Sequence, residues 1–245
     1  ITILCENSVE LPFKVIGEHG FACFIETPGA SYLFDTGQGL GIINNSLVLK
    51  KNLSEIESIV ISHGHYDHTG GLVDVLQVTG ERPVFAHPDI FVKRFWEKDE
   101  TKKYIGIPFS REYLESAGAR FKFNTGMVEL GKNVYITGEI PRTNHFEKED
   151  PDMFVLDENG NSIKPDPIRD DLSLVLDTEK GLVVVLGCAH AGMINILDYV
   201  VGALNKSRIY AVIGGTHLGF SGETQFQKTL KSIDEYGIER IGVSH

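Results

Sequence analysis

The sequence predicts an α/β fold, in which strands and helices alternate around mixed β-sheets. Short apolar segments separated by turns fill residues 1–34, which is the pattern of a β-meander. An apolar run at 58–62 leads through a polar loop into a helical pattern, and residues 182–243 alternate between strand and helix patterns. With 245 residues, of which 42% are hydrophobic, the chain is long enough to bury a core as a single domain over 1–245.

In the first third of the chain, Asp35 and the polar loop at 63–68 are expected to lie at the ends of strands. Asp35 directly follows an apolar run and precedes a glycine-rich turn. Such an Asp is either an ordinary turn residue or a hydrogen-bond partner of a metal-binding histidine. The expected strands are 1–5, 21–26, 31–34, 58–62 and 83–86, and the expected helices are 41–50 and 71–78.

Residues 89–124 mix aromatic and basic side chains and lack a glycine-rich linker at either end. We expect helical segments inserted into the domain, packed over the edge of a sheet. The alternative is a cap whose aromatic and basic side chains hold an aromatic or anionic substrate.

Residues from about 138 to 170 form a long irregular segment. Loops of this length inside a compact domain are usually functional, so we expect an active-site loop. Within it, the planar guanidinium of Arg142 is suited to clamp a phosphate or carboxylate. Other polar residues of the segment lack metal-ligand spacing and are expected to be solvated, namely His145, Glu147, Glu149, Asp150 and Asp152.

The last third is expected to form a hairpin, 172–176 with 182–186, followed by alternating helices and strands to 243. Several predicted strands of the chain end in a histidine. One such histidine would be a structural residue, but four at equivalent positions favour a common site at one edge of a sheet. These residues are His63, His190, His217 and His245.

The segment 63–68, with the sequence His-Gly-His-Tyr-Asp-His, concentrates metal-binding side chains between a strand and a helix. His63 and His65 are two positions apart, so in an extended backbone their imidazoles project to the same side and can bind one ion. Asp67 and His68 follow a turn and are expected to reach a second ion position. Nitrogen ligands with one carboxylate and no thiolate favour zinc, with manganese, iron or cobalt as alternatives.

This His-x-His-x-Asp-His pattern, together with Leu-Phe-Asp-Thr-Gly at 33–37, resembles the signature of the metallo-β-lactamase superfamily. The resemblance covers nearly the whole chain and implies an αββα sandwich of two mixed β-sheets flanked by helices. It also implies that the two ions share an activated water, with Asp67 accepting its proton. The implied ligands are His63, His65 and His190 for metal one, and Asp67, His68 and His245 for metal two.

Two departures from the superfamily pattern concern the third ligand of metal one. Where the superfamily usually has a Thr-Pro-Gly-His-type turn before the hairpin, this chain has Asp170-Asp171. Where the superfamily has a bridging Asp after the hairpin, this chain has Cys188-x-His190. We expect His190 to be the ligand, with Cys188 or Asp171 as alternatives. His217 exceeds the six-ligand set, so its expected role is that of a proton donor or substrate hydrogen-bond partner, against a metal or structural role.

Further segments are similar to the dihydropteroate-synthase-like branch of the superfamily, notably Gly-Glu-Ile-Pro-Arg at 138–142 and Gly-Gly-Thr-His-Leu at 214–218. That branch includes archaeal enzymes that join a pterin pyrophosphate to an aminobenzene ribose phosphate. The resemblance implies an anionic, phosphate-bearing small-molecule substrate. We therefore expect a metal-dependent hydrolase, with a pterin-linked C–N bond-forming enzyme, an iron-pair oxidoreductase or a non-catalytic metal-binding sensor as alternatives.

Composition limits the partners and the compartment. The net charge of -11 opposes tight binding to a phosphate backbone, so no nucleic acid is expected. The apolar runs are far shorter than the roughly 18 residues of a membrane span. Three cysteines without metal-ligand spacing suit a reducing compartment, so we expect a cytoplasmic protein without a membrane partner.

Overall fold

The computed structural model describes residues 1–10, 12, 14–157, 159–163 and 165–245. The chain folds into two compact units. The first unit consists of Ile1–Lys93, Ile105–Asn124 and His245, and the second of Arg94–Tyr104 and Thr125–Ser244. Among the described residues, no helix has the length and apolar character to cross a bilayer.

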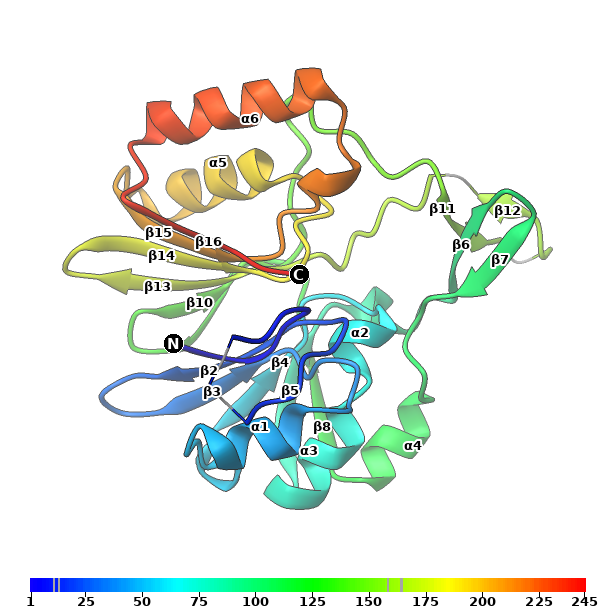
Figure 1. The fold of residues 1–245 in the computed structure, drawn as a ribbon, viewed down its shortest axis with the longest axis vertical. Helices are drawn as coiled ribbons and strands as arrows, with labels where there is room; N and C mark the ends of the chain where they lie inside the picture. The colour runs from blue at the N-terminus through cyan, green and yellow to red at the C-terminus, as the bar shows by residue number, and fades with distance from the viewer. Residues whose placement is uncertain (11, 13, 158, 164) are drawn as a thin grey trace. The chain divides into compact units, whose positions relative to one another are not determined.

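The first unit contains a six-stranded mixed sheet in the order β1-β2-β3-β4-β5-β8. The first three strands are antiparallel, and the strands from β3 to β8 run parallel. Helices α1 and α3 lie on the same face of this sheet (Figure 1). The strands are β1 (Thr2–Cys5), β2 (Ala22–Glu26), β3 (Ser31–Phe34), β4 (Ser58–Val60), β5 (Arg82–Ala86) and β8 (Ala119–Phe123), and the helices are α1 (Ile42–Val48), η1 (Leu53–Glu55), α2 (Tyr66–Thr69), α3 (Leu72–Thr79), η2 (Pro88–Phe91) and α4 (Arg111–Ser116).

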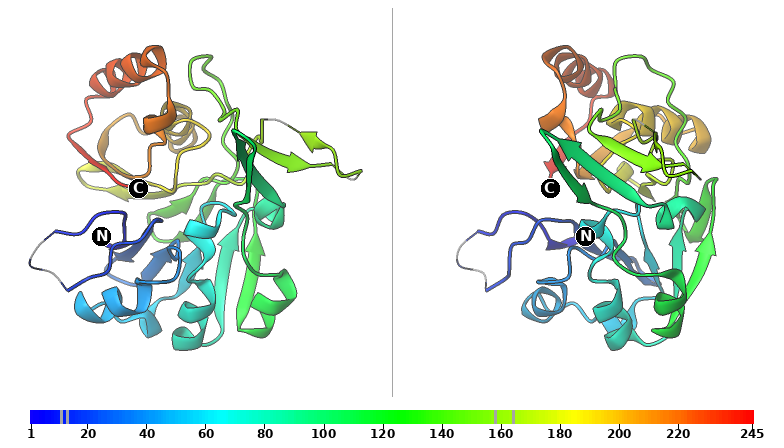
Figure 2. Two further views of the ribbon diagram at one scale, coloured as in Figure 1. Left: turned by 45° about the vertical axis from the view of Figure 1, so that its right-hand side comes forward. Right: turned by 90° about the vertical axis from the view of Figure 1, so that its right-hand side faces the viewer.

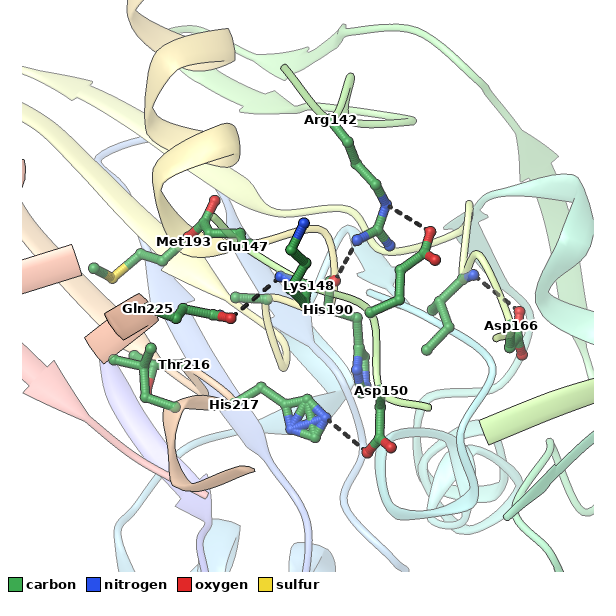
Figure 3. A pocket seen from close by; sticks show the side chains of 15 residues that line it. Arg142, Glu147, Lys148, Asp150, Asp166, His190, Met193, Thr216, His217 and Gln225 are labelled. Carbon is green, nitrogen blue, oxygen red and sulfur yellow. Dashed lines mark hydrogen bonds and ion pairs between the residues drawn. The ribbon is translucent and has the colours of Figure 1, made fainter. Parts of the chain in front are cut away.

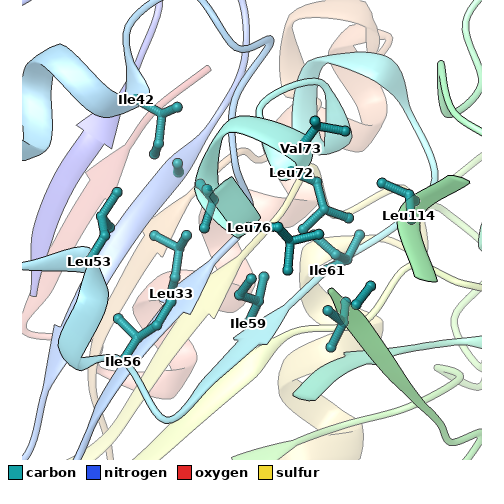
Figure 4. Packing of buried hydrophobic residues seen from close by; sticks show 14 of the residues in the cluster. Leu33, Ile42, Leu53, Ile56, Ile59, Ile61, Leu72, Val73, Leu76 and Leu114 are labelled. Carbon is teal, nitrogen blue, oxygen red and sulfur yellow. The ribbon is translucent and has the colours of Figure 1, made fainter. Parts of the chain in front are cut away.

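The core of the first unit forms where apolar side chains of the parallel strands meet one face of α3. Leu33 and Ile59 from the sheet and Leu72 and Leu76 from α3 are buried in one cluster (Figure 4). The buried positions of α3 recur at helical spacing, whereas all three residues of β4 are buried because a central parallel strand is covered on both faces. This packing fixes β4, the strand that leads into the histidine loop.

The second unit contains a second six-stranded mixed sheet in the order β16-β15-β14-β13-β10-β9. Strands β14, β15 and β16 are parallel, and the remaining pairs are antiparallel. Helices α5 and α6 cover the same face of this sheet (Figure 1). The elements are β9 (Val128–Gly131), β10 (Val134–Ile136), β13 (Leu174–Thr178), β14 (Gly181–Leu186), α5 (Met193–Leu204), β15 (Ile209–Gly214), η3 (Leu218–Phe220), α6 (Glu223–Tyr236) and β16 (Arg240–Val243).

A third sheet, of four strands in the order β12-β11-β6-β7, also belongs to the second unit. Figure 2 shows its two hairpins from two further sides. Its strands are β6 (Arg94–Lys98), β7 (Thr101–Tyr104), β11 (Met153–Leu156) and β12 (Ser162–Ile163).

The prediction of a helical insertion at 89–124 is wrong for most of its length. Helical structure is confined to η2 and α4, and the rest includes β6, β7 and β8. The aromatic residues are paired across strands: the ring of Phe95 lies 5.4 Å from that of Tyr104 on β7 and stacks at 5.4 Å on Phe154 of β11. Aromatic side chains favour strands when such cross-strand partners exist, and one of these partners, Phe154, comes from a distant part of the chain.

The segment predicted as an irregular loop at about 138–170 contains β11 and β12. Its end is anchored by the buried guanidinium of Arg94, which forms a bidentate pair with Asp170 at 2.6 and 3.0 Å and contacts Asp166 at 2.9 Å. A buried guanidinium needs such partners because an unpaired charge would be costly in the interior. The segment before Asp171 is therefore held in place by β6.

The predicted α/β fold class is confirmed by the two mixed sheets and their helices. The predicted alternation of helices and strands up to residue 243 is confirmed, with α5 at Met193–Leu204 and α6 at Glu223–Tyr236. Both helices have long, regular apolar spacing, which is a strong local signal.

Candidate metal centre

His63 and His65 follow β4 and are brought together as predicted. His63 Nε2 lies 2.9 Å from His65 Nδ1, and both side chains are buried. The backbone of the loop is fixed by residues 105 and 106: the amide of Tyr66 donates to the carbonyl of Ile105, and His65 forms a β-bridge with Gly106. The chain thus holds these two imidazoles in a defined geometry.

Asp67 and His68 lie on α2. The carboxylate of Asp67 is close to both histidines that were predicted to bind the second metal ion. Asp67 Oδ2 lies 3.0 Å from His245 Nε2 and 3.7 Å from His68 Nε2. Burial alone would raise the pKa of the Asp67 carboxyl, but the charge of His68 and the hydrogen bond from His245 outweigh it, so this pKa lies well below its usual range. Asp67 is therefore ionised at neutral pH, as a metal ligand must be.

Asp35, at the end of β3, orients two of these histidines. Its Oδ1 accepts the backbone amide of Ser62 at 2.7 Å, and its Oδ2 accepts the Ser62 hydroxyl and His68 Nδ1, each at 2.7 Å. Because the Ser62 hydroxyl donates to Asp35, it acts as an acceptor for His63 Nδ1 at 2.9 Å. Both imidazoles then carry their proton on Nδ1 and direct the lone pair of Nε2 into the cluster, the arrangement typical of metal-binding histidines.

His19 is a member of this cluster that the sequence pattern did not reveal. Its Nε2 lies 3.3 Å from Asp67 Oδ2, and its ring centroid lies 4.8 Å from that of His245. His19 precedes β2 in a short bend, where a lone histidine beside a glycine has no distinguishing spacing. Its position became apparent only from the fold.

The predicted site residues His190 and His217 belong to the second unit, where they are neighbours. Their ring centroids lie 4.4 Å apart in an edge-to-face arrangement (Figure 3). His217 Nε2 lies 3.7 Å from Asp150 Oδ2, so this carboxylate, which was expected to be solvated, faces a candidate catalytic histidine.

The peptide group between His190 and Ala191 is held at both ends by charged side chains. Arg142 Nη1 donates to the carbonyl of His190 at 2.9 Å, and Asp171 Oδ2 accepts the amide of Ala191 at 2.7 Å. Arg142 also donates to the carbonyl of Pro167 at 2.7 Å. In this structure the guanidinium expected to bind a substrate anion therefore binds backbone carbonyls and fixes the turn that carries His190 (Figure 3).

The expectation that four strand-end histidines share one sheet edge is wrong. His63 follows β4 of the first sheet, whereas His190 and His217 follow β14 and β15 of the second. His245 follows β16 but is part of the first unit, where its amide donates to Glu6 Oε1 at 2.9 Å. Spacing along the chain could identify strand ends but not the sheet to which each strand belongs.

A cavity of about 640 Å³ opens in the second unit beside His217. Its volume lies within the range of small-molecule sites. The wall combines aromatic rings, ammonium groups and carboxylates. The aromatic rings belong to Trp96, Phe146 and Phe220, the ammonium groups to Lys98, Lys148 and Lys228, and the carboxylates to Glu149, Asp150 and Asp152.

Comparison with known proteins places the chain in a family. Residues 16–245 match the family model described as the metallo-β-lactamase superfamily. The chain is 31% identical over 237 residues to a 7,8-dihydropterin-6-methyl-4-(β-D-ribofuranosyl)-aminobenzene-5'-phosphate synthase of Methanocaldococcus jannaschii, covering 93% of this chain and 80% of that protein. An uncharacterised protein of the same organism is 32% identical over 222 residues, covering 89% of this chain and 79% of that protein.

Among solved structures, the chain is similar to a metal-dependent hydrolase of the β-lactamase superfamily. The TM-score is 0.84 and the identity 30%, with 100% of this chain and 86% of the other covered. The family model spans most of the sequence, and this structural match extends over all of it. This chain belongs to the metallo-β-lactamase superfamily and has its mixed α/β fold.

Proposed function

We propose that this protein is a metal-dependent hydrolase that uses a metal-activated water on an anionic, phosphate-bearing small molecule. The observation that carries the proposal is the donor cluster of the first unit. There, imidazole nitrogens of His63 and His65 lie 2.9 Å apart, and Asp67 Oδ2 lies 3.0 Å from His245 Nε2. Buried imidazole and carboxylate groups gathered in this way are suited to bind cations.

The donor set fits zinc. It offers nitrogen atoms and a carboxylate, the ligands zinc prefers, and hydrogen bonds at Nδ1 orient His63 and His68. Manganese, iron and cobalt accept the same donors. We assign His63, His65 and His190 to metal one, and Asp67, His68 and His245 to metal two, with Cys188 or Asp171 as the alternatives to His190.

When bound, the metal ions would supply Lewis acidity and lower the pKa of a water toward neutrality. The residues of the chain then provide the proton transfers. Asp67, ionised at neutral pH, is the proposed proton acceptor. His217, whose Nε2 lies 3.7 Å from Asp150 Oδ2, is the proposed proton donor to the leaving group.

The proposed substrate class is supported by the cavity beside His217 and by the relatives. Lysine ammonium groups can pair with a phosphate, aromatic rings can stack on a planar group, and carboxylates can accept N–H or O–H donors of the same ligand. The Methanocaldococcus jannaschii relative is named for a product that combines a pterin with an aminobenzene ribose phosphate. Such a molecule carries each of these groups.

A second candidate function is the formation of a pterin-linked C–N bond. Identity of 31% to the synthase over 93% of the chain favours it. The two candidates share a phosphate-bearing substrate and differ in the acceptor, which is water for the hydrolase and an aromatic amine for the synthase. They are separated by incubating the zinc-loaded protein with a pterin pyrophosphate, with and without an aminobenzene ribose phosphate.

The test of the metal-dependent function is turnover of a panel of phosphomonoesters and phosphodiesters by the zinc-loaded protein and by His65→Ala. We expect His65→Ala to lose turnover by at least about 100-fold without rescue by added zinc, because a ligand of the activating ion is missing. Glu235→Gln, which replaces an exposed residue of α6 that does not line the cavity beside His217, is the control and should keep its activity. Full activity of metal-free protein would refute the proposal, and zinc binding without turnover on any substrate would indicate a sensor.

A further inference from the structure

We propose that His19 is an additional ligand of the second cation, which would extend the ligand set to His19, Asp67, His68 and His245. The inference rests on the proposed metal centre and adds a residue to it. It starts from the atoms around Asp67 Oδ2. His19 Nε2 lies 3.3 Å and His245 Nε2 3.0 Å from this oxygen, and the three donor atoms lie within 4.8 Å of one another.

These separations suit a shared ion. With metal–ligand bonds of about 2.1 Å, donors at the corners of a tetrahedron around zinc are roughly 3.4 Å apart. The contacts of Asp67 Oδ2 with His19 and His245, at 3.3 and 3.0 Å, are close to that value. A small movement of the side chains would admit the ion.

The orientation of the rings supports a shared ion. The Nε2 atoms of His19 and His245 lie 3.3 and 3.0 Å from one oxygen of Asp67, and His68 Nε2 lies 3.7 Å from the same oxygen, beyond hydrogen-bond distance. His68 Nδ1 contacts Asp35 and His245 Nδ1 contacts Asn7, so these rings point Nε2 toward Asp67 as metal-binding imidazoles do.

The backbone on either side of His19 is fixed against this site. The amide of Phe21 donates to the carbonyl of Asp67 at 3.3 Å. Gly20 has a φ of +135°, and a Cβ there would lie 2.2 Å from the carbonyl oxygen of Asp67, so only glycine permits this approach. The amide of Gly20 donates to Asn7 Oδ1 at 3.2 Å, the same oxygen that contacts His245 Nδ1 at 3.2 Å.

On the other side, the buried carboxylate of Glu18 accepts the backbone amides of Leu40 at 2.6 Å and Gly41 at 3.3 Å. The His19 side chain itself is 55% exposed, whereas that of Asp67 is 8% exposed. His19 therefore closes the outer side of the cluster. Because it is not part of the core, it can be replaced without leaving a cavity.

The experiment measures zinc binding by the full chain. Metal-free protein is titrated with zinc in a chelator buffer, bound metal is counted by mass spectrometry, and thermal unfolding verifies the fold. His19→Gln keeps an N–H donor for Asp67 but provides a poor ligand. His19→Asp introduces a carboxylate, which can bind zinc, and His145→Ala controls for the loss of an exposed histidine.

We expect wild type and His145→Ala to bind two equivalents of zinc. His19→Gln should keep the first equivalent and bind the second at least about tenfold more weakly, since changes even beyond the direct ligands cost 10- to 100-fold. His19→Asp should recover part of that loss. Replacing zinc with cobalt should give a visible spectrum for the second site that differs between wild type and His19→Gln.

The inference would be overturned if His19→Gln bound the second equivalent as tightly as wild type, which would reduce His19 to a hydrogen-bond donor. It would also be overturned if wild type bound a single equivalent. The first result leaves the proposed hydrolase unaffected, whereas a single equivalent would remove the assignment of metal two but still allow a hydrolase with one ion. A wild-type protein that binds no zinc would refute the metal-dependent function itself.

Discussion

At the scale of single residues, the candidate site depends on side chains that orient the donors as much as on the donors. Asp35 is buried and adopts a φ of +58°, an uncommon conformation that Asp tolerates better than most residues. It receives three hydrogen bonds from Ser62 and His68. The sequence predicted that Asp35 is either an ordinary turn residue or a hydrogen-bond partner of a metal-binding histidine. The structure confirms the hydrogen bond, to His68.

We predict that Asp35→Asn weakens zinc binding by about 10- to 100-fold, the range found when partners of ligand histidines are changed. The amide retains one acceptor oxygen and places an N–H₂ group among donors, so one hydrogen bond to Ser62 or His68 is lost. The buried mismatch should also lower the free energy of unfolding of the metal-free protein by about 1–3 kcal/mol. Chelator competition and thermal unfolding measure the two effects.

Asp157→Asn is the matched control for Asp35→Asn. Asp157 is an exposed carboxylate that also accepts several hydrogen bonds, from the backbone and side chain of a turn at 159–161. Its replacement should leave zinc affinity unchanged. Equal zinc affinities for wild type and Asp35→Asn, with both proteins folded, would exclude the orienting role.

At the scale of elements, α5 shows how a helix predicted from local pattern depends on a distant residue for its N-terminus. The helix begins after Gly192, which has no side chain to cap it. Glu147 does so instead, accepting the amides of Ile194 at 2.8 Å and Asn195 at 2.9 Å. A carboxylate at a helix N-terminus satisfies free amides and interacts favourably with the helix dipole. The prediction that Glu147 is solvated is therefore wrong.

The buried position of Glu147 gives a pH-dependent contribution to stability. Burial raises the pKa of its carboxyl above the usual range, and the hydrogen bonds from Ile194 and Asn195 only partly oppose this. In the unfolded chain the Glu147 carboxyl has the ordinary pKa, and in the folded chain its pKa is higher. Between these values the folded state holds more protons, so stability must fall as pH rises through the window.

We predict that the free energy of unfolding of metal-free wild type falls across this window relative to that of Glu147→Gln, whose side chain does not titrate. Urea unfolding at a series of pH values above the usual Glu pKa measures the difference between the two proteins. Glu235→Gln, at an exposed position of α6, controls for the loss of a charge. The prediction would be contradicted if the difference in unfolding free energy between wild type and Glu147→Gln stayed constant with pH, or if wild type became more stable relative to Glu147→Gln as pH rises.

The misassigned segment 89–124 shows where element prediction failed. Strands β6 (Arg-Phe-Trp-Glu-Lys) and β7 (Thr-Lys-Lys-Tyr) show no regular alternation of apolar and polar residues, and neither buries a continuous apolar face. Strand β6 pairs with β7 in a hairpin, but its other neighbour, β11, follows more than fifty residues later in the chain. A short strand whose partner is distant has a weak local signal.

At the scale of the whole molecule, metal binding should stabilise the fold. The donors of the first unit come from positions as far apart in sequence as His19 and His245, so they are dispersed when the chain unfolds. A ligand that binds only the folded state raises stability by about 2.7 kcal/mol when its concentration is 100 times the dissociation constant. Binding and folding are therefore coupled.

We predict that removing metal with a chelator lowers the melting temperature and that zinc restores it. Differential scanning calorimetry of the full chain measures the shift. Magnesium is the control cation, because it prefers oxygen ligands and should restore little. His65→Ala should show a smaller zinc-dependent shift than wild type. A melting temperature insensitive to both chelator and zinc would contradict coupling between the donor cluster and folding.

The sequence by itself determined the alternation of strands and helices and the compact loop of donors from His63 to His68. Both are local: apolar periodicity and two-residue spacing act within a few residues and need no distant partner. Only the tertiary structure decided that His19 and His245 approach Asp67, that Arg142 and Asp171 hold the His190 peptide, and that 94–104 forms strands. These contacts depend on which backbone segments pack together, and packing is set by the cooperative burial of the whole core.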